Sequence, residues 1–81
     1  MENNYFELPI TWKDTEDIAM ALYERFGREF TDSKIYRIRF TDLHKWVLEI
    51  PNFVGKPEES TEAYLEMIQS AWVYEWRDNE K

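Results

Sequence analysis

Residues 41–51 read TDLHKWVLEIP, and this stretch decides the fold class. Its large apolar side chains recur at the spacing of one helical face: Leu43, Trp46, Val47 and Ile50. Thr41 is a favourable N-cap residue, and Pro51 cannot continue a helix. The stretch therefore predicts an amphipathic helix with Asp42 as its first residue and one buried face.

Residues 14–26, nearer the start of the chain, have the same kind of pattern. Asp14 is the predicted N-cap, and Gly27 suits the position just past a helix end. Apolar side chains follow at four-residue spacing: Ile18, Leu22 and Phe26. This pattern predicts a second amphipathic helix.

A third helix is predicted from residue 60 or 61 to about Arg77, with Ser60 or Thr61 as its cap. Its core stripe is Leu65, Ile68, Trp72 and Trp76. Residues 28–34 read as a polar turn, and the alternation over residues 35–40 predicts a short strand. Residues 6–10 also alternate, which indicates a short edge strand or an extended arm packed on the domain.

The predicted architecture is mainly α: three helices with a short strand in one domain, compatible with a helix-turn-helix or winged-helix topology. We expect an N-terminal extension over residues 1–10, the folded domain over 11–77 and a tail over 78–81. The chain of 81 residues is long enough for one core, which its four Trp, five Tyr and five Phe help to fill.

Composition excludes several kinds of site and disfavours two classes of partner. The chain has 17 acidic and 10 basic residues, a formal charge of −7, no cysteine and one histidine. Disulfides, thiolate metal sites and multi-histidine zinc sites are therefore excluded within one chain. No apolar run approaches the ~20 residues of a membrane span. We expect a monomer in the cytoplasm, with no membrane partner.

Charge is uneven along the chain, with a basic middle between acidic flanks. Residues 33–50 carry four bases and two acids, while residues 1–32 carry eight acids and three bases. The basic middle raises the question of DNA binding, but the predicted helix at 41–50 would present two acids on its reading face. The overall field also repels a polyanion, so we expect no nucleic-acid partner.

The first helix carries the most informative polar face. At 100° per residue, Asp14, Asp17 and Glu24 lie roughly opposite the apolar stripe, with Met20 beside them and expected to be exposed. Methionine adapts to partner surfaces, so this face is a candidate docking site. The same carboxylates are candidate oxygen ligands for a hard cation, held weakly. Spacing alone favours an ordinary solvated face over either function.

No catalytic constellation is visible, so we expect a protein that is not an enzyme. A Ser–His–Asp arrangement would have to use His44, and nothing in the spacing supports it. There is no glycine-rich phosphate loop. His44 lies off the apolar stripe of its helix, which favours a boundary histidine with a hydrogen bond over a ligand or partner contact.

A set of short motifs resembles the IscX (YfhJ) family of iron–sulfur cluster assembly proteins. The most specific is FTDLHKW at residues 40–46; WxD at 12–14, DI at 17–18, ALY at 21–23, Phe53, Pro57, SxE at 60–62 and Trp72 also match. The resemblance runs from about Ile10 to Glu75 and implies a modified winged-helix scaffold without DNA function.

The resemblance also implies a function. It implies an adaptor that docks on a basic surface of an IscS-type cysteine desulfurase and modulates cluster assembly. It further implies weak binding of ferrous iron, with no tightly bound cofactor. Asp14, Asp17 and Glu24 match acidic positions of the family's first helix, so the resemblance and the helical wheel together favour a docking face there, with Met20.

Other features of the resemblance are structural or divergent. Asp42, His44 and Trp46 match the motif, and folding alone explains Asp42 at the first helical position and Trp46 in the core. Residues 52–57 read NFVGKP, where the family typically has acids, which puts iron binding at this loop in doubt. Met20 stands where another acid is expected. The alternative function, from another class, is a generic acidic helical interaction module with no iron–sulfur role.

Overall fold

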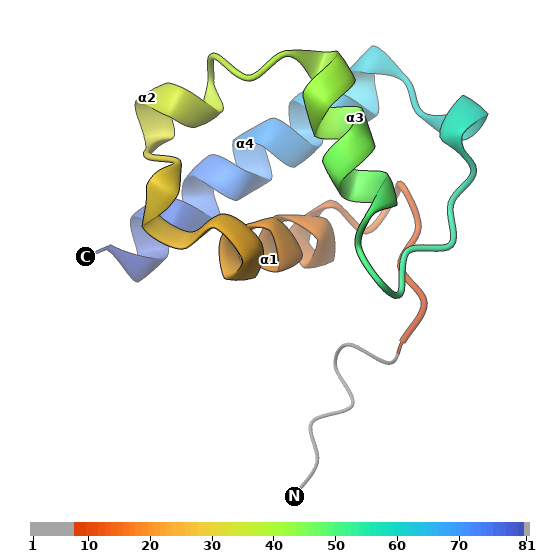
Figure 1. Ribbon diagram of the computed structural model, residues 1–81, viewed down its shortest axis with the longest axis horizontal. Helices are drawn as coiled ribbons and strands as arrows, with labels where there is room; N and C mark the ends of the chain where they lie inside the picture. The colour runs from red at the N-terminus through yellow and green to blue at the C-terminus, as the bar shows by residue number, and fades with distance from the viewer. Residues whose placement is uncertain (1–7, 81) are drawn as a thin grey trace, which may run out of the picture.

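A computed structural model describes residues 8–80, which form four α-helices and two short 3₁₀ turns (Figure 1). The helices are α1 (Thr15–Phe26), α2 (Asp32–Ile35), α3 (Phe40–Leu48) and α4 (Glu62–Asn79). The 3₁₀ turns are η2 (Gly27–Glu29) and η3 (Pro57–Glu59). The prediction of a mainly helical single domain is confirmed.

α1 begins and ends where the sequence predicts, although Asp14 does not cap it through its side chain. The Asp14 carboxylate instead accepts hydrogen bonds from the Thr11 backbone N–H at 2.8 Å and from the Thr11 hydroxyl at 3.2 Å. At the other end, Gly27 has φ 53° and ψ −130°, a conformation that only glycine adopts without strain. The helix therefore stops at Phe26.

α4 is capped by Thr61, whose hydroxyl oxygen accepts a hydrogen bond from the Tyr64 backbone N–H at 3.1 Å. The helix runs to Asn79, beyond the predicted end near Arg77. Beyond it, the Glu80 carboxylate accepts hydrogen bonds from the Tyr23 hydroxyl and the Arg28 Nε–H, each at 3.1 Å. These contacts fasten the end of α4 to the end of α1.

The predicted polar turn at 28–34 and strand at 35–40 are wrong, because the chain forms α2 across their boundary. Thr31 is its N-cap, and its hydroxyl oxygen accepts a hydrogen bond from the Lys34 backbone N–H at 3.5 Å. At the other end, the Gln69 side chain of α4 donates to the carbonyl oxygen of Ile35 at 2.9 Å. Ile35 itself is fully buried.

The alternation that suggested a strand has another cause. Ile38 and Phe40 are half-buried, whereas Arg37 and Arg39 are exposed. The connector between α2 and α3 therefore lies along the core with alternate residues inward. Within residues 8–80 no strand pairs with it, so the period-two pattern does not become a ladder.

α3 begins at Phe40, with Arg39 at the N-cap, so the prediction that Thr41 caps it is wrong. Arg39 has extended backbone angles, and its carbonyl accepts the first helical hydrogen bond from the Leu43 N–H at 3.0 Å. Phe40 is half-buried against the core, and this packing draws one more residue into the helix. Asp42 consequently stands third in the helix rather than first.

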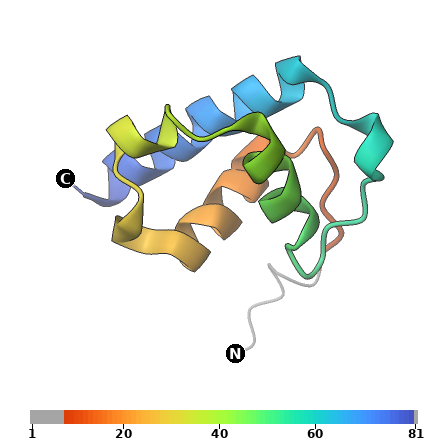
Figure 2. The same cartoon turned by 45° about the horizontal axis from the view of Figure 1, so that its top comes forward.

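The start of the described chain lies beside the loop after α3, as Figures 1 and 2 both show. Ile10 and Phe53 form an isolated parallel bridge, in which the Ile10 N–H donates to Asn52 and the Val54 N–H donates to Ile10, at 3.0 and 2.8 Å. Residues 8–10 are thus an extended arm. The rest of the predicted alternation, at residues 6–7, lies outside the described residues.

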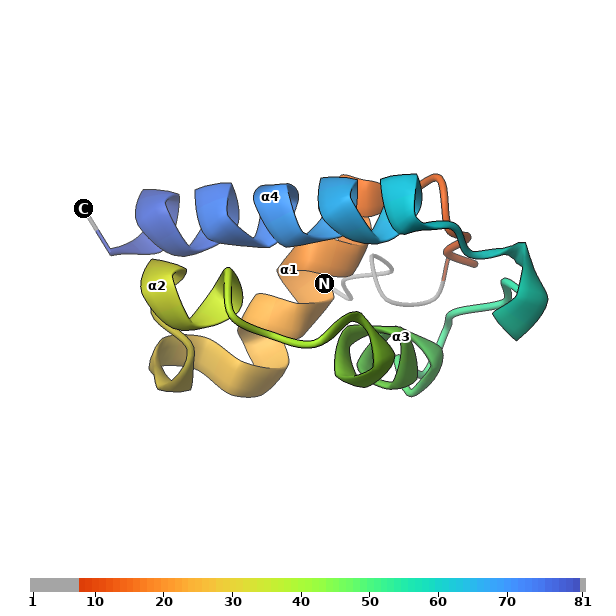
Figure 3. The ribbon, with the colours of Figure 1, turned by 90° about the horizontal axis from the view of Figure 1, so that it is seen from above.

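The core lies where α4, α1 and α3 meet. Figure 3 shows α4 along one side of the molecule, with α2 and α3 on the opposite side. The most extensive packing between helices is that of α1 against α4. The buried apolar residues are Ile10, Trp12, Ile18, Ala19, Leu22, Ile35, Leu43, Val47, Ile50, Leu65, Ile68, Trp72 and Val73. The described residues contain almost no extended pairing, so the winged-helix topology stays a prediction.

Candidate functional site

The predicted docking face follows α1 from one end to the other. Asp14 and Asp17 are half-buried, and Glu24 is exposed near the end of the helix. Met20 is half-buried rather than exposed, because it faces toward α4 and lines a groove there. The face is therefore less uniform than the helical wheel predicts. Its carboxylates lie near the two ends of α1, and Met20 between them turns toward α4.

The carboxylates of this face do not converge on a metal ion. At 1.5 Å per residue, Asp14 and Glu24 lie about 15 Å apart along the helix axis. The Asp14 carboxylate is also engaged by Thr11. Residues 8–80 contain no cluster of three or more acidic, histidine or cysteine side chains with the geometry of a metal site. The residues therefore do not fit a preformed ferrous site.

His44 takes part in an aromatic clasp that we define as Trp12, His44 and Phe53. The His44 ring stacks on Trp12, and Phe53 meets Trp12 edge-on with ring centroids 4.9 Å apart. His44 Nε2 lies 3.0 Å from the Pro57 carbonyl oxygen, which can only accept, so this nitrogen carries the proton. The Trp12 indole N–H donates to the Lys56 carbonyl at 2.7 Å. The imidazole is thus used in structural contacts.

The other two motif residues differ from each other in their environment. Trp46 packs against Phe26, Phe30 and Trp72, with ring centroids between 4.8 and 6.4 Å apart. Asp42 is exposed in the first turn of α3, where its charge complements the positive end of the helix. Trp46 accordingly joins the core, while Asp42 stabilises a helix start.

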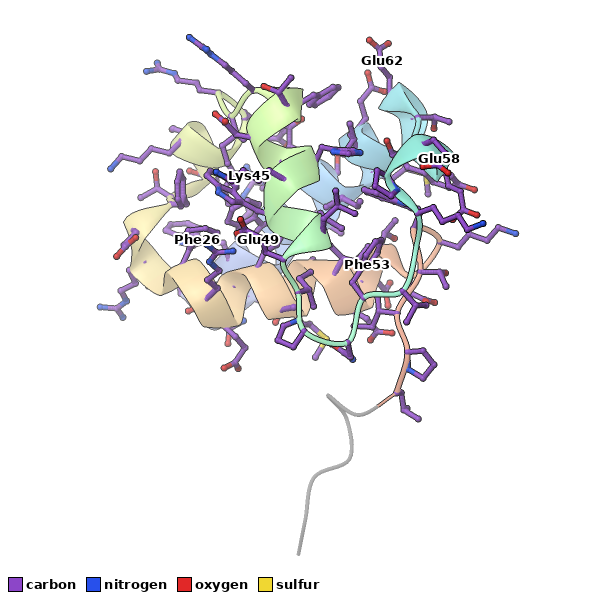
Figure 4. The ribbon with its side chains drawn as sticks, turned by 45° about the vertical axis from the view of Figure 1, so that its right-hand side comes forward. Phe26, Lys45, Glu49, Phe53, Glu58 and Glu62 are labelled. Carbon is purple, nitrogen blue, oxygen red and sulfur yellow. The ribbon has the colours of Figure 1, made fainter. Side chains whose placement is uncertain are left out.

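A small apolar pocket of about 280 Å³ opens beside Glu24. Its walls come from α1 and from the turn after α3, and include Leu22, Ile50 and Pro51. At its edge, Arg25 Nη1 and Glu49 Oε1 form an ion pair of 2.7 Å. Figure 4 shows Glu49 on the side of α3 that faces Phe26. The pair ties α1 to α3 next to the docking face.

A second acidic group lies at η3 and the start of α4, where Glu59 shares a pocket with Thr11 and Lys13 of the segment before α1. Figure 4 shows Glu58 and Glu62 projecting from η3 and from the start of α4, and both are exposed. Glu59 instead accepts a hydrogen bond from the Lys56 backbone N–H at 3.0 Å. Local capping and the helix dipole account for these positions.

Sequence reasoning missed the groove between α1 and α4. It has a volume of about 670 Å³, and its walls include Glu16, Met20, Met67 and Tyr74. The sequence carries a signal for it, because Met67 and Tyr74 are apolar residues that lie outside the core stripe of α4.

Among the helices of residues 8–80, none has both the length and the apolar character needed to cross a membrane.

Comparison with known proteins now places this helical domain. A family model described as iron–sulphur cluster assembly matches residues 10–77, which covers all four helices except the last two residues of α4. The chain belongs to the iron–sulphur cluster assembly family. This is the IscX (YfhJ) family that the sequence resembles, so the resemblance is confirmed. Iron–sulphur cluster assembly is accordingly the process of this family.

One curated relative is similar over nearly its whole length. It is the uncharacterized protein PA3808 of Pseudomonas aeruginosa, which is 37% identical over 68 residues. The match covers 84% of this chain and 97% of the relative. In this iron–sulphur cluster assembly domain, Gly55 of the non-acidic loop at 52–57 lies against the clasp, because a Cβ there would lie 2.7 Å from both Phe53 and Trp12. Val54, Lys56 and Pro57 of the same loop are exposed.

Proposed function

We propose that this chain is an adaptor of iron–sulphur cluster assembly that docks through the acidic face of α1 onto a basic surface of a cysteine desulfurase. The observation that carries the proposal is the arrangement of Asp14, Asp17 and Glu24 along the side of α1 away from the core, in a chain of this family. Met20 adds an apolar contact at the edge of the same face.

The proposed mechanism is electrostatic. A protein with a formal charge of −7 is attracted to a basic partner, and charges at the rim of an interface mainly set the association rate and its salt dependence. The adaptor is proposed to be a monomer of the cytoplasm that performs no catalysis. Any effect on the desulfurase would then be steric or conformational.

The direct test is a titration of the isotopically labelled protein with its host's cysteine desulfurase, at about 50 and 200 mM salt, while amide shifts are recorded. Binding that perturbs residues 14–24 and weakens at the higher salt supports the proposal, because screening grows as the Debye length shortens. Absence of binding at low salt contradicts it.

A charge-matched pair of variants tests the location. Asp17→Lys reverses one charge on the proposed face, and Glu58→Lys makes the same change at an exposed position in η3, far along the chain from α1. We expect Asp17→Lys to weaken binding several-fold and Glu58→Lys to change it much less. Equal effects would mean that only net charge matters and that α1 is not the contact.

The second candidate is a generic acidic interaction module, which predicts indifference to the desulfurase. A role in binding ferrous iron has less support, because the carboxylates do not converge within residues 8–80. Line broadening by added ferrous iron confined to Asp14, Asp17 and Glu24 would restore that role.

A further inference from the structure

The groove between α1 and α4 has an apolar floor that is open to solvent. Ala19 and Met20 of α1 face Met67, Ala71 and Tyr74 of α4 across it. α1 and α4 are the most extensively packed pair of helices, so the floor is supported by the core beneath it. The space of about 670 Å³ is large enough for several side chains of a partner.

Two large apolar side chains on this floor are unusually exposed. Met67 is 54% exposed and Tyr74 is 67% exposed. They are seven residues apart on one face of α4, which places them about 10 Å apart along the helix. Other exposed large apolar residues, such as Val54 and Tyr36, lie outside the groove. Neighbouring exposed apolar side chains indicate an interaction surface more strongly than scattered ones.

The rim of the groove is acidic. Glu16 stands on the α1 side, and Glu66, Glu75 and Asp78 stand on the α4 side. No lysine, arginine or histidine of residues 8–80 lines the groove. An apolar floor inside a carboxylate rim is complementary to a segment with apolar side chains on one face and basic side chains beside them.

We propose that this groove binds a basic amphipathic segment of a partner protein. Its apolar side chains would cover Met67 and Tyr74, and its lysines or arginines would lie against the carboxylate rim. Methionine suits this role because its flexible thioether adapts to the shape of the incoming side chain. A second copy of the chain is disfavoured as occupant, since two molecules of charge −7 repel each other.

This inference goes beyond the desulfurase proposal and does not depend on it. The docking face of α1 carries charges along its length, whereas the groove adds an apolar anchor and four further carboxylates, mainly from α4. Only Met20 belongs to both surfaces. One chain would therefore offer two adjoining contacts, one electrostatic and one with apolar anchors.

The test uses the full chain and a synthetic peptide of about 14 residues, long enough as a helix to span the groove. The peptide carries leucines on one helical face and lysines on the other. A second peptide has the same composition in scrambled order. We expect amide shifts around residues 15–20 and 66–78 with the first peptide, and binding at least several-fold weaker with the second.

Matched variants separate the groove from general acidity. Met67→Ser combined with Tyr74→Ser removes the exposed anchors, and we expect about tenfold weaker peptide binding, as for interface hot spots. Val54→Ser removes a similarly exposed apolar side chain outside the groove, and we expect no change. Circular dichroism of each variant establishes that the fold is retained.

Three results would overturn the inference: equal affinity for the ordered and scrambled peptides, shifts that lie away from the groove, or full affinity in the Met67/Tyr74 double variant. Shifts at the groove that grow with protein concentration, without peptide, would assign it to a second copy instead. Asp17→Lys supplies the distinction from the desulfurase proposal, because that variant alters α1 docking while leaving both groove anchors in place.

Discussion

The imidazole of His44 stacks on the indole of Trp12, with ring centroids 5.3 Å apart and ring planes inclined by 21°. The two residues come from α3 and from the segment before α1, so their contact joins parts of the chain that are far apart in sequence. Both side chains also hydrogen-bond to carbonyl groups of residues 56–57. One stacked pair therefore joins the segment before α1, α3 and the loop at residues 56–57.

His44→Ala should lower the free energy of unfolding by about 1–2 kcal/mol, through loss of the ring contact and of one hydrogen bond. His44→Phe should lose less, because it keeps a ring against Trp12. Urea denaturation followed by circular dichroism measures both changes. Lys45→Ala, at an exposed position of the same helix, is the control; a His44→Ala loss no larger than that of the control would contradict a structural role.

The two glycines should respond to substitution for different reasons. Gly55→Ala places a Cβ 2.7 Å from ring atoms of Phe53 and Trp12, so the clasp must shift, at a cost of about 1–3 kcal/mol. Gly27→Ala meets no atom within 4 Å in the described chain, and its cost of about 1–3 kcal/mol comes from backbone strain at φ 53°.

Tryptophan fluorescence distinguishes the two mechanisms in the folded state. We expect Gly55→Ala to change the emission spectrum, because Trp12 must move, and Gly27→Ala to leave it unchanged while lowering the unfolding midpoint. Two unchanged spectra with equal stability losses would argue against crowding at Gly55.

The long helices could be predicted from the sequence because their periodicity is long enough to be unambiguous. The apolar stripes of α1 and α4 extend over about two and three turns respectively, and Thr61, one of the two predicted caps, caps α4. α2 has only four residues, too few to show a helical periodicity, so the sequence pattern there indicates a turn and a strand instead. The start of α3 depended on how Phe40 packs, which is a tertiary effect.

The candidate site was predicted in part. The helical wheel predicts that Asp14, Asp17 and Glu24 lie away from the core stripe of α1, but it predicts an exposed Met20, whereas Met20 turns toward α4. That orientation depends on the neighbouring helix, which local spacing does not contain. The core stripe of α4 predicts its buried face alone and gives no sign that Met67 and Tyr74, both exposed on another side of the helix, line a groove.

Trp72 provides a prediction about an unsatisfied polar atom in the core. Its side chain is fully buried, and within residues 8–80 nothing accepts a hydrogen bond from its indole N–H. Trp72→Ala should lower the free energy of unfolding by about 3–5 kcal/mol through the cavity it creates. Trp72→Phe keeps most of the ring and removes an N–H whose unpaired burial costs about 1–3 kcal/mol.

The Trp72→Phe loss should therefore be less than half of the Trp72→Ala loss in guanidinium denaturation. Leu65→Ala, within the same helix, gives the cost of an ordinary buried side chain that has no polar atom. Equal losses for Trp72→Phe and Trp72→Ala would contradict this prediction. They would mean that the indole N–H of Trp72 has a hydrogen-bond acceptor in solution that offsets the cost of its burial.

Tyr23 should make stability fall at high pH. Its pKa is raised above the ordinary value of 10.0, first by desolvation and then by its hydrogen bond to Glu80, whose charge also opposes ionisation. The folded state thus favours the neutral phenol. Its contribution to stability is fully present below the ordinary pKa and is lost as the pH rises through the higher pKa of the folded state.

The measurement is the urea midpoint between about pH 8 and pH 11, compared with that of Tyr23→Phe, which lacks the titrating hydroxyl. We expect the natural chain to lose more stability than the variant over this range, because ionised Tyr23 can no longer donate to the Glu80 carboxylate. The difference in absorbance at 295 nm between the two proteins should show that Tyr23 ionises at a higher pH than a free tyrosine does. Parallel stability curves, or ionisation at the ordinary pKa, would show that the Tyr23–Glu80 contact does not hold the ends of α1 and α4 together in solution.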